Sequence, residues 1–192
     1  MKRYITQEIL KKFKVFSCKN VFLNQELFTI YKQNQLVFGY YGGIREDIER
    51  WRIYYPGHKR YKFISNWKSF RLQGSHVLPK KGDFVVITKS LKDVMVLYAL
   101  GIPAIAPISE NCFVTDAQWE KLKERFKHKI LLYDNDRAGK IASAKLRRKY
   151  PELHIMLIPN HTNAKDISDY YKMWGKDKTL ELIETAKKYI EG

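Results

Sequence analysis

Hydrophobic and polar positions follow two rhythms along the chain, and the rhythm changes near residue 80. In the first part, short apolar runs separated by turn residues such as Gly42 and Gly43 predict short, mostly antiparallel strands. These strands are expected at residues 27–31, 36–40, 51–55 and 62–64. They follow a helix expected over residues 5–16, for which Thr6 is a suitable N-cap.

The second part of the chain alternates strands with helices. Strands are expected at residues 84–88, 104–108, 130–133 and 154–158, and helices at 91–100, 115–126, 141–150, 166–173 and 179–190. This alternation predicts an α/β fold with a parallel sheet, right-handed crossovers and helices on both faces. The segment 79–82 holds a proline, two lysines and a glycine, and is the expected boundary. We therefore expect a small, mixed α+β, basic subdomain over residues 1–82 and a sheet domain over residues 83–192.

Charge is unevenly divided between these two parts. The 192-residue chain has a formal net charge of +16; residues 1–82 hold 17 Lys and Arg against 5 Asp and Glu, whereas residues 83–192 hold 19 against 15. A basic segment interleaved with aromatic side chains suits a nucleic-acid backbone with bases stacked on rings. The aromatic residues concerned are Tyr4, Phe13, Tyr54, Tyr55, Tyr61, Phe63, Trp67 and Phe70. A basic surface that serves solubility alone is the alternative.

Cysteine usage and hydropathy narrow the class of protein. Cys18 and Cys112 form no CxxC or Cys/His cluster, so a structural zinc site is not expected. Two separate cysteines fit a reducing, cytoplasmic environment. No apolar run approaches the roughly 20 residues of a membrane span, and the N-terminus lacks the apolar core of a signal peptide.

Candidate chemistry gathers at the carboxyl edge expected for the parallel sheet, where ligands bind in open α/β folds. The apolar run 130–133 ends in Asp134 and Asp136, whose side chains would point the same way on extended backbone. Such a pair suits a hard divalent cation, and two such ions can serve an in-line phosphoryl displacement. An aspartate cap on the following helix is the alternative. Other acidic residues expected at this edge are Asp93, Asp166 and Asp169.

Three segments carry a resemblance to a known family. Residues 134–139 (DNDRAG) are similar to the DxDxAG signature of Toprim domains, and residues 165–169 (KDISD) resemble the third acidic motif of that family. Residues 61–66 (YKFISN) are similar to a segment in the basic subdomain of primases of the DnaG type. The chain from Val85 to about Tyr171 thus resembles the Toprim domain in the catalytic core of bacterial and phage DNA primases.

This resemblance implies an RNA-polymerase core that makes short RNA primers from ribonucleoside triphosphates on single-stranded DNA during replication. It implies Mg²⁺ (or Mn²⁺) ions held by Asp134, Asp136, Asp166 and Asp169. Nucleic-acid or phosphate contacts are implied for Lys62, Asn66, Arg71 and Lys140. The zinc-binding and helicase-interaction domains of full-length primases are not seen in the sequence. The chain is then either a fragment or a minimal primase that relies on separate partners, for which a replicative helicase and a separate zinc-binding domain are the candidates. The compact form is more like that of phage proteins.

Lys89 departs from the family pattern, which has Glu-Gly at the end of the first strand, where the Glu is associated with metal binding or proton transfer. A charged lysine cannot bind Mg²⁺. The site could be silent, leaving a module that binds single-stranded nucleic acid or nucleotides; Lys89 could face the triphosphate; or Glu110 could replace the missing carboxylate. If the site is active, the expected catalytic residues are Asp134, Asp136, Asp93, Glu110 and Lys89. A Toprim nuclease or a topoisomerase fragment is a further alternative, although such topoisomerases need a tyrosine nucleophile in another domain.

Overall fold

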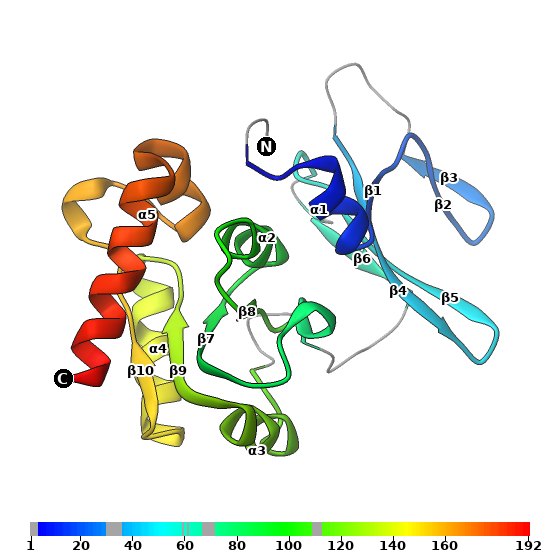
Figure 1. Ribbon diagram of the computed structural model, residues 1–192. Coiled ribbons are helices and arrows are strands. Elements are labelled where there is room, and N and C mark those ends of the chain that lie inside the picture. The colour runs from blue at the N-terminus through cyan, green and yellow to red at the C-terminus, as the bar shows by residue number, and fades with distance from the viewer. Residues whose placement is uncertain (1–3, 30–35, 59, 61, 67–71, 109–112) are drawn as a thin grey trace. The chain divides into compact units, whose positions relative to one another are not determined.

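The computed structural model describes residues 4–29, 36–58, 60, 62–66, 72–108 and 113–192. The chain divides into two compact units, Met1–Ser69 and Phe70–Gly192 (Figure 1). The boundary expected at residue 82 lies inside the second unit, because Gln73 and Ala106 exchange two backbone hydrogen bonds of 2.8 and 3.1 Å and Leu72 joins the core of that unit. The expected division into functional domains stays a prediction.

The first unit is built on an antiparallel sheet with the strand order β1-β4-β5-β6. The elements of this unit are α1 (Gln7–Lys12), β1 (Val15–Ser17), β2 (Val21–Leu23), β3 (Glu26–Thr29), β4 (Phe38–Arg45), β5 (Ile48–Tyr54) and β6 (Phe63–Ser65). Strands β2 and β3 pair separately as a hairpin. Val21, Val37 and Tyr55 form a small buried cluster, against which Ile53 of β5 packs.

Two expectations for this unit are wrong in detail. The first helix ends at Lys12 and not at residue 16, because Lys14 has a left-handed φ of 54° and β1 then pairs with β4. The turn expected at Gly42 and Gly43 lies inside β4, next to a shift in register. The chain reverses instead at Glu46 and Asp47, with φ of 55° and 58°. Two successive left-handed residues give a two-residue hairpin loop that matches the twist of its strands.

The second unit confirms the α/β fold class, with a four-stranded sheet in the order β10-β9-β7-β8, parallel throughout. The strands are β7 (Gly82–Thr88), β8 (Ala104–Ile105), β9 (Phe126–Leu132) and β10 (Leu153–Ile155). The helices are α2 (Leu91–Ala99), α3 (Asp116–Arg125), α4 (Arg137–Lys149) and α5 (Ile167–Glu191), with single 3-10 turns η1 (Ser75–Val77) and η2 (Asn160–Thr162).

Helices cover both faces of this sheet (Figure 1). On one face, Val85, Ile87 and Leu131 pack with residues of α3 and α4, including Trp119 and Leu146. Because side chains alternate along a strand, Val86, Ile130 and Leu132 point to the opposite face, where they are also buried. Helices α2 and α5 lie on that side and contact each other. The sheet is therefore buried on both faces, as its near-continuous apolar strands require.

The helix after β9 begins at Arg137, earlier than the expected residue 141, because Asp136 serves as its N-cap. The two helices expected at the C-terminal end are confirmed as two segments of α5, which is kinked at Gly175, with φ 78° and ψ −176°. A left-handed φ of this kind favours glycine. Within the described part of the chain, no helix is both long enough and apolar enough to cross a membrane.

Candidate functional site

Neighbouring strands place Lys89 beside Asp134. Thr88, the last residue of β7, is in register with Leu132, the last residue of β9, so the two segments that follow leave the sheet side by side. Lys89 Nζ donates a hydrogen bond of 3.1 Å to Asp134 Oδ2. The two side chains are only 20% and 11% exposed, so this ion pair is largely shielded from water.

A second lysine approaches the same carboxylate from the loop before α5. The backbone N–H of Asn135 donates to the Lys165 carbonyl at 2.7 Å, which fixes this loop against the end of β9. Lys165 Nζ then lies 3.6 Å from Asp134 Oδ2 and 3.4 Å from Asp136 Oδ2. The carboxylates of Asp134 and Asp136 therefore reach one and the same cation.

Asp136 also caps α4, as the alternative interpretation predicts. Its Oδ1 accepts a hydrogen bond of 2.8 Å from the backbone N–H of Gly139. This hydrogen bond, with the ammonium of Lys165, lowers the pKa of Asp136. Capping occupies Oδ1, while Oδ2 faces Lys165. The two roles are compatible, because each uses a different oxygen.

Asp166 and Asp169 lie at the start of α5. Asp166 Oδ1 accepts from the backbone N–H of Asp169 at 2.7 Å and caps the helix, while Lys92 Nζ donates to Asp166 Oδ2 at 3.0 Å. Burial works to lower the pKa of Lys92, but the carboxylates of Asp93 and Asp166 outweigh it and raise that pKa. Asp166 thus has its own lysine partner, like Asp134.

Asp93 is buried, with 1% of its surface exposed, and three hydroxyl groups surround its carboxylate. Ser168 donates to Oδ1, and Ser90 and Thr88 donate to Oδ2 at 2.6 and 3.4 Å. Burial and the nearby charge of Asp166 raise the pKa of Asp93 to about 6, although the serine hydroxyls and Lys92 oppose the shift. Asp93 therefore joins the starts of α2 and α5, and its predicted catalytic role stays a prediction.

Polar side chains continue this edge toward η2. Asn160 Oδ1 accepts from Asn135 Nδ2 at 3.0 Å and from Lys140 Nζ at 3.3 Å. Asn135 Oδ1 is buried and accepts no hydrogen bond from the described residues. Asn135, which lies between Asp134 and Asp136 in the chain, thus holds a buried oxygen that has no hydrogen-bond donor among the described residues.

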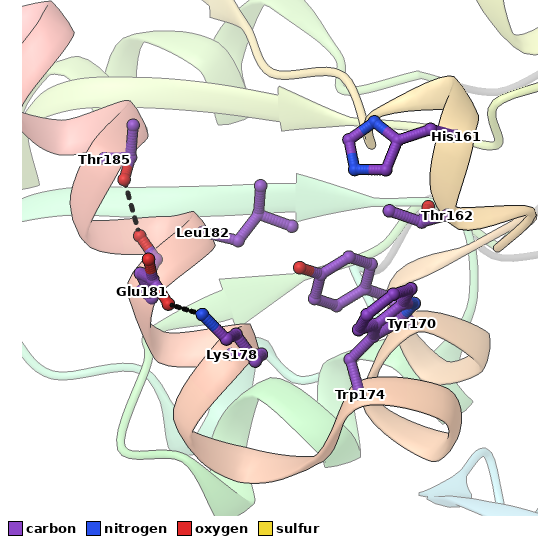
Figure 2. Close-up of a pocket in the computed structure, with 8 residues that line it drawn as sticks. All are labelled: His161, Thr162, Tyr170, Trp174, Lys178, Glu181, Leu182 and Thr185. Atoms are coloured by element: carbon purple, nitrogen blue, oxygen red, sulfur yellow. Dashed lines mark hydrogen bonds and ion pairs between the residues drawn. The ribbon is translucent and has the colours of Figure 1, made fainter.

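A cavity of about 270 Å³ lies next to this edge, between η2 and α5 (Figure 2). His161, which follows Asn160, and Tyr170, which follows Asp169, line it. The Tyr170 and Trp174 rings are stacked with centroids 6.2 Å apart, and Lys178 is bound to Glu181 at 2.7 Å (Figure 2). The cavity is therefore lined by aromatic rings and polar groups, and two of its residues directly follow Asn160 and Asp169 in the chain.

The remaining predicted residues are placed as follows. Glu110 and Arg71 lie outside the described residues. Lys62 and Asn66 belong to the first unit. Lys62 is exposed, whereas the Asn66 side chain is used within the sheet, accepting from Trp51 N–H at 2.9 Å and donating to the Glu49 carbonyl at 2.8 Å. Asn66 therefore holds β5 in place, and its nucleic-acid role stays a prediction.

Sequence reasoning did not single out Lys92, Lys165 or Ser168. Lys92 and Lys165 each precede an aspartate in the chain, which is a weak signal, because charged neighbours are common on exposed loops. Their partners lie in other segments of the chain: Asp166 is 74 residues from Lys92, and Asp134 and Asp136 are 31 and 29 residues from Lys165. Among the described residues, no three His, Cys, Asp or Glu side chains are grouped so as to hold a metal ion as they stand.

Comparison with known proteins identifies the fold. The family model described as Toprim-like matches residues 86–171. The DnaG catalytic core superposes with a TM-score of 0.69 at 16% identity, covering 94% of this chain and 69% of that one. The primase fragment of the bacteriophage T7 primase-helicase gives 0.66 at 18%, covering 93% and 72%.

The primase of Aquifex aeolicus, with its zinc-binding and RNA-polymerase domains, gives a TM-score of 0.64 at 16% identity, covering 95% of this chain and 53% of that one. No curated protein matched the chain. The superpositions agree with the α/β fold described above. Residues 86–171 therefore match the Toprim-like family model, and the chain has the fold of the catalytic core of DnaG-type primases.

Proposed function

We propose that this protein is the RNA-polymerase core of a primase, which joins ribonucleotides on a single-stranded DNA template by metal-dependent nucleotidyl transfer. The observation that carries the proposal is the arrangement of Asp134 and Asp136. Their Oδ2 atoms lie 3.6 and 3.4 Å from one ammonium group, at the carboxyl end of a Toprim-like sheet. Two carboxylates that share one cation have the donor chemistry for a divalent ion.

The residues at this edge fit Mg²⁺ or Mn²⁺ in their chemistry. Asp134 and Asp136 would hold the ion, and the Lys165 ammonium stands at present where a cation can contact both. When bound, such an ion neutralises the charge of a triphosphate and of the developing leaving group. Asp166 and Asp169 would support it from the start of α5, with Lys89 and Lys140 directed to phosphate.

The first unit supports a role in template binding. The rings of Phe38, Tyr54 and Phe63 form one row across β4, β5 and β6, with centroids 6.3 and 4.8 Å apart and interplanar angles of 23° and 20°. The Arg52 guanidinium lies 4.3 Å from the Phe63 ring centroid. Aromatic rows of this kind stack nucleobases, and basic side chains follow the phosphates. Among the matched structures, a DnaG catalytic domain is bound to single-stranded DNA.

Two of the matched structures suggest partners for this chain. The T7 fragment comes from a primase-helicase, and the Aquifex chain carries a zinc-binding domain. We propose that this protein works with a replicative helicase and a zinc-binding domain on a separate chain or segment.

Glu110 is proposed as a further carboxylate of the site, to be tested by Glu110→Gln.

Primer synthesis tests the proposal. The protein is incubated with single-stranded DNA, labelled ribonucleotides and Mg²⁺ or Mn²⁺, beside the variant Asp134→Ala/Asp136→Ala. Asp83→Ala is the matched control, because Asp83 is exposed at the opposite, amino end of β7. Short RNA products from the wild type and the control, but not from the double variant, are expected. Products that persist in the double variant would refute the proposed site.

Lys89 favours one alternative function, a silent module that binds nucleotides or single-stranded nucleic acid. A lysine paired at 3.1 Å with Asp134 stands where the family has a carboxylate. In that case DNA binding would be retained without RNA products, also when a primase zinc-binding domain is added in trans. Degradation of the DNA when metal ions are present and ribonucleotides are absent would indicate a nuclease instead.

A further inference from the structure

Lysine ammonium groups occupy the acidic edge of the Toprim-like sheet. Lys89 and Lys165 both contact Asp134 Oδ2, at 3.1 and 3.6 Å, and Lys165 also reaches Asp136 at 3.4 Å. Lys92 pairs with Asp166 at 3.0 Å in the same way. Three of the four proposed metal ligands, Asp134, Asp136 and Asp166, therefore already have a positive partner.

We propose that Lys89 and Lys165 are built-in counter-ions that compete with the divalent cation for Asp134 and Asp136. The ammonium groups and the metal ion would exclude each other at this pair of carboxylates. The inference rests on the metal site of the proposed function, and adds to it two lysines that set how tightly that site holds its ion.

Burial explains why a counter-ion is needed at all times. The Asp134 side chain is 11% exposed, so water solvates its charge poorly, and a buried carboxylate without a partner is strongly unfavourable. Lys89, with 20% of its side chain exposed, supplies that partner from the end of β7. Lys165 is 59% exposed and reaches in from the solvent side. The Lys89 side chain is therefore largely enclosed, whereas the Lys165 side chain can move away into solvent readily.

Geometry explains why the two kinds of cation compete. Mg²⁺ binds carboxylate oxygens at about 2.0–2.1 Å and demands a nearly ideal octahedral shell. An ion at that distance from Asp134 Oδ2 would stand next to two ammonium groups, and like charges at such separations repel strongly where water is excluded. The ion can enter only as the ammonium groups move away. Both lysines lie on segments at the sheet edge, so once displaced they stay near the place where a triphosphate would lie.

Metal affinity, measured without any reaction, tests the inference. Mn²⁺ binding to the full chain is followed by the electron paramagnetic resonance of free Mn²⁺ for wild type, Lys165→Met and Lys89→Met/Lys165→Met. Lys121→Met/Lys145→Met is the matched control, because both lysines are exposed on α3 and α4 and carry the same total charge. Lys89→Glu adds a fourth comparison, since it replaces the counter-ion by a further carboxylate.

We expect Mn²⁺ to bind about threefold to tenfold tighter to Lys165→Met, and tighter still to the double variant and to Lys89→Glu. The control should change affinity less than twofold, about the limit of such a titration. Equal or weaker binding in Lys165→Met, which removes an exposed side chain and should fold normally, would overturn the inference. So would an equal gain in the control, because that would reflect net charge alone. Tighter binding together with primer synthesis that stays absent, also when a primase zinc-binding domain is added in trans, would keep the inference and refute the proposed function.

Discussion

Asp93 is a residue at which burial, charge and hydrogen bonding act on one carboxylate. Its pKa is raised from the ordinary 3.8 to about 6, chiefly by burial and then by the charge of Asp166. The folded protein therefore holds a proton on Asp93 that the unfolded chain has released between about pH 4 and pH 6. The contribution of this proton to the free energy of unfolding is complete below about pH 4. It is lost as the pH rises through about 6, and the loss amounts to roughly 3 kcal/mol.

Asp93→Asn checks this value. Other groups titrate in the same range, so the informative quantity is the difference between the unfolding free energies of wild type and variant. The free energy of unfolding of wild type minus that of the variant should be largest near pH 4. It should be smaller by about 3 kcal/mol near pH 7. Chemical denaturation at several pH values measures it, with the exposed Asp83→Asn as the control. A difference that stays constant with pH would contradict the raised pKa.

Individual residues also show how far sequence reasoning reaches. The run 130–133 with Asp134 and Asp136 behind it is visible in the sequence, because a short apolar run that ends abruptly in charges is typical of a buried parallel strand. The cationic partners of those carboxylates are not visible. They depend on the register of Thr88 with Leu132 and on the loop that brings Lys165 back to Asn135. Such contacts between distant segments leave no local pattern.

At the scale of elements, the passage from β9 into α4 depends on Gly139. A Cβ added there would lie 2.1 Å from the Asp134 carbonyl oxygen and 3.0 Å from the carbonyl carbon. Gly139 lies inside the first turn of α4, where the missing side chain allows the close approach of the two segments. We predict that Gly139→Ala pushes Asp134 away from its lysine partners, and destabilises the fold by about 1–3 kcal/mol.

This prediction has two readouts. Denaturation gives the stability loss, and Mn²⁺ binding should weaken at the same time, because the carboxylate pair is displaced. Gly57→Ala is a suitable control, since nothing lies within 4 Å of a Cβ at that position and its φ is not left-handed. Full stability in Gly139→Ala would show that the backbone at Asp134 can yield without cost.

Elements with a strong pattern agree with expectation, and those decided by long-range pairing do not. The four parallel strands and their helices are confirmed as elements because apolar runs and N-caps such as Thr115 are local signals. The strands expected at 104–108 and 154–158 are shorter than predicted, because β8 pairs only over Ala104–Ile105 and β10 only over Leu153–Ile155. The short strand β1 is missed because three residues carry no periodicity, and its strand conformation comes from pairing with β4. In the same way, the hairpin turn at Glu46 and Asp47 contains no glycine, so the sequence there does not predict a turn.

At the scale of the whole molecule, the excess of positive charge predicts how DNA binding depends on salt. The net charge is +16, with most of the excess in residues 1–82. For single strands, the logarithm of the binding constant falls with the logarithm of salt concentration by a slope of about 0.7 per neutralised phosphate. A protein that binds through several lysines should therefore lose affinity steeply between about 50 and 200 mM salt.

Lys62 allows contact with phosphate to be separated from general attraction. If the exposed Lys62 neutralises one phosphate, Lys62→Gln should lower the slope by about 0.7, whereas a lysine that acts only through the net charge should leave the slope nearly unchanged. Lys121→Gln, on the exposed side of α3, has the same charge change and serves as the control. Fluorescence anisotropy of a labelled oligonucleotide across the salt series gives both slopes. Equal slopes for the two variants would mean that the basic first unit attracts DNA without Lys62 touching it, and the template path would then have to be sought along other basic residues of residues 1–82.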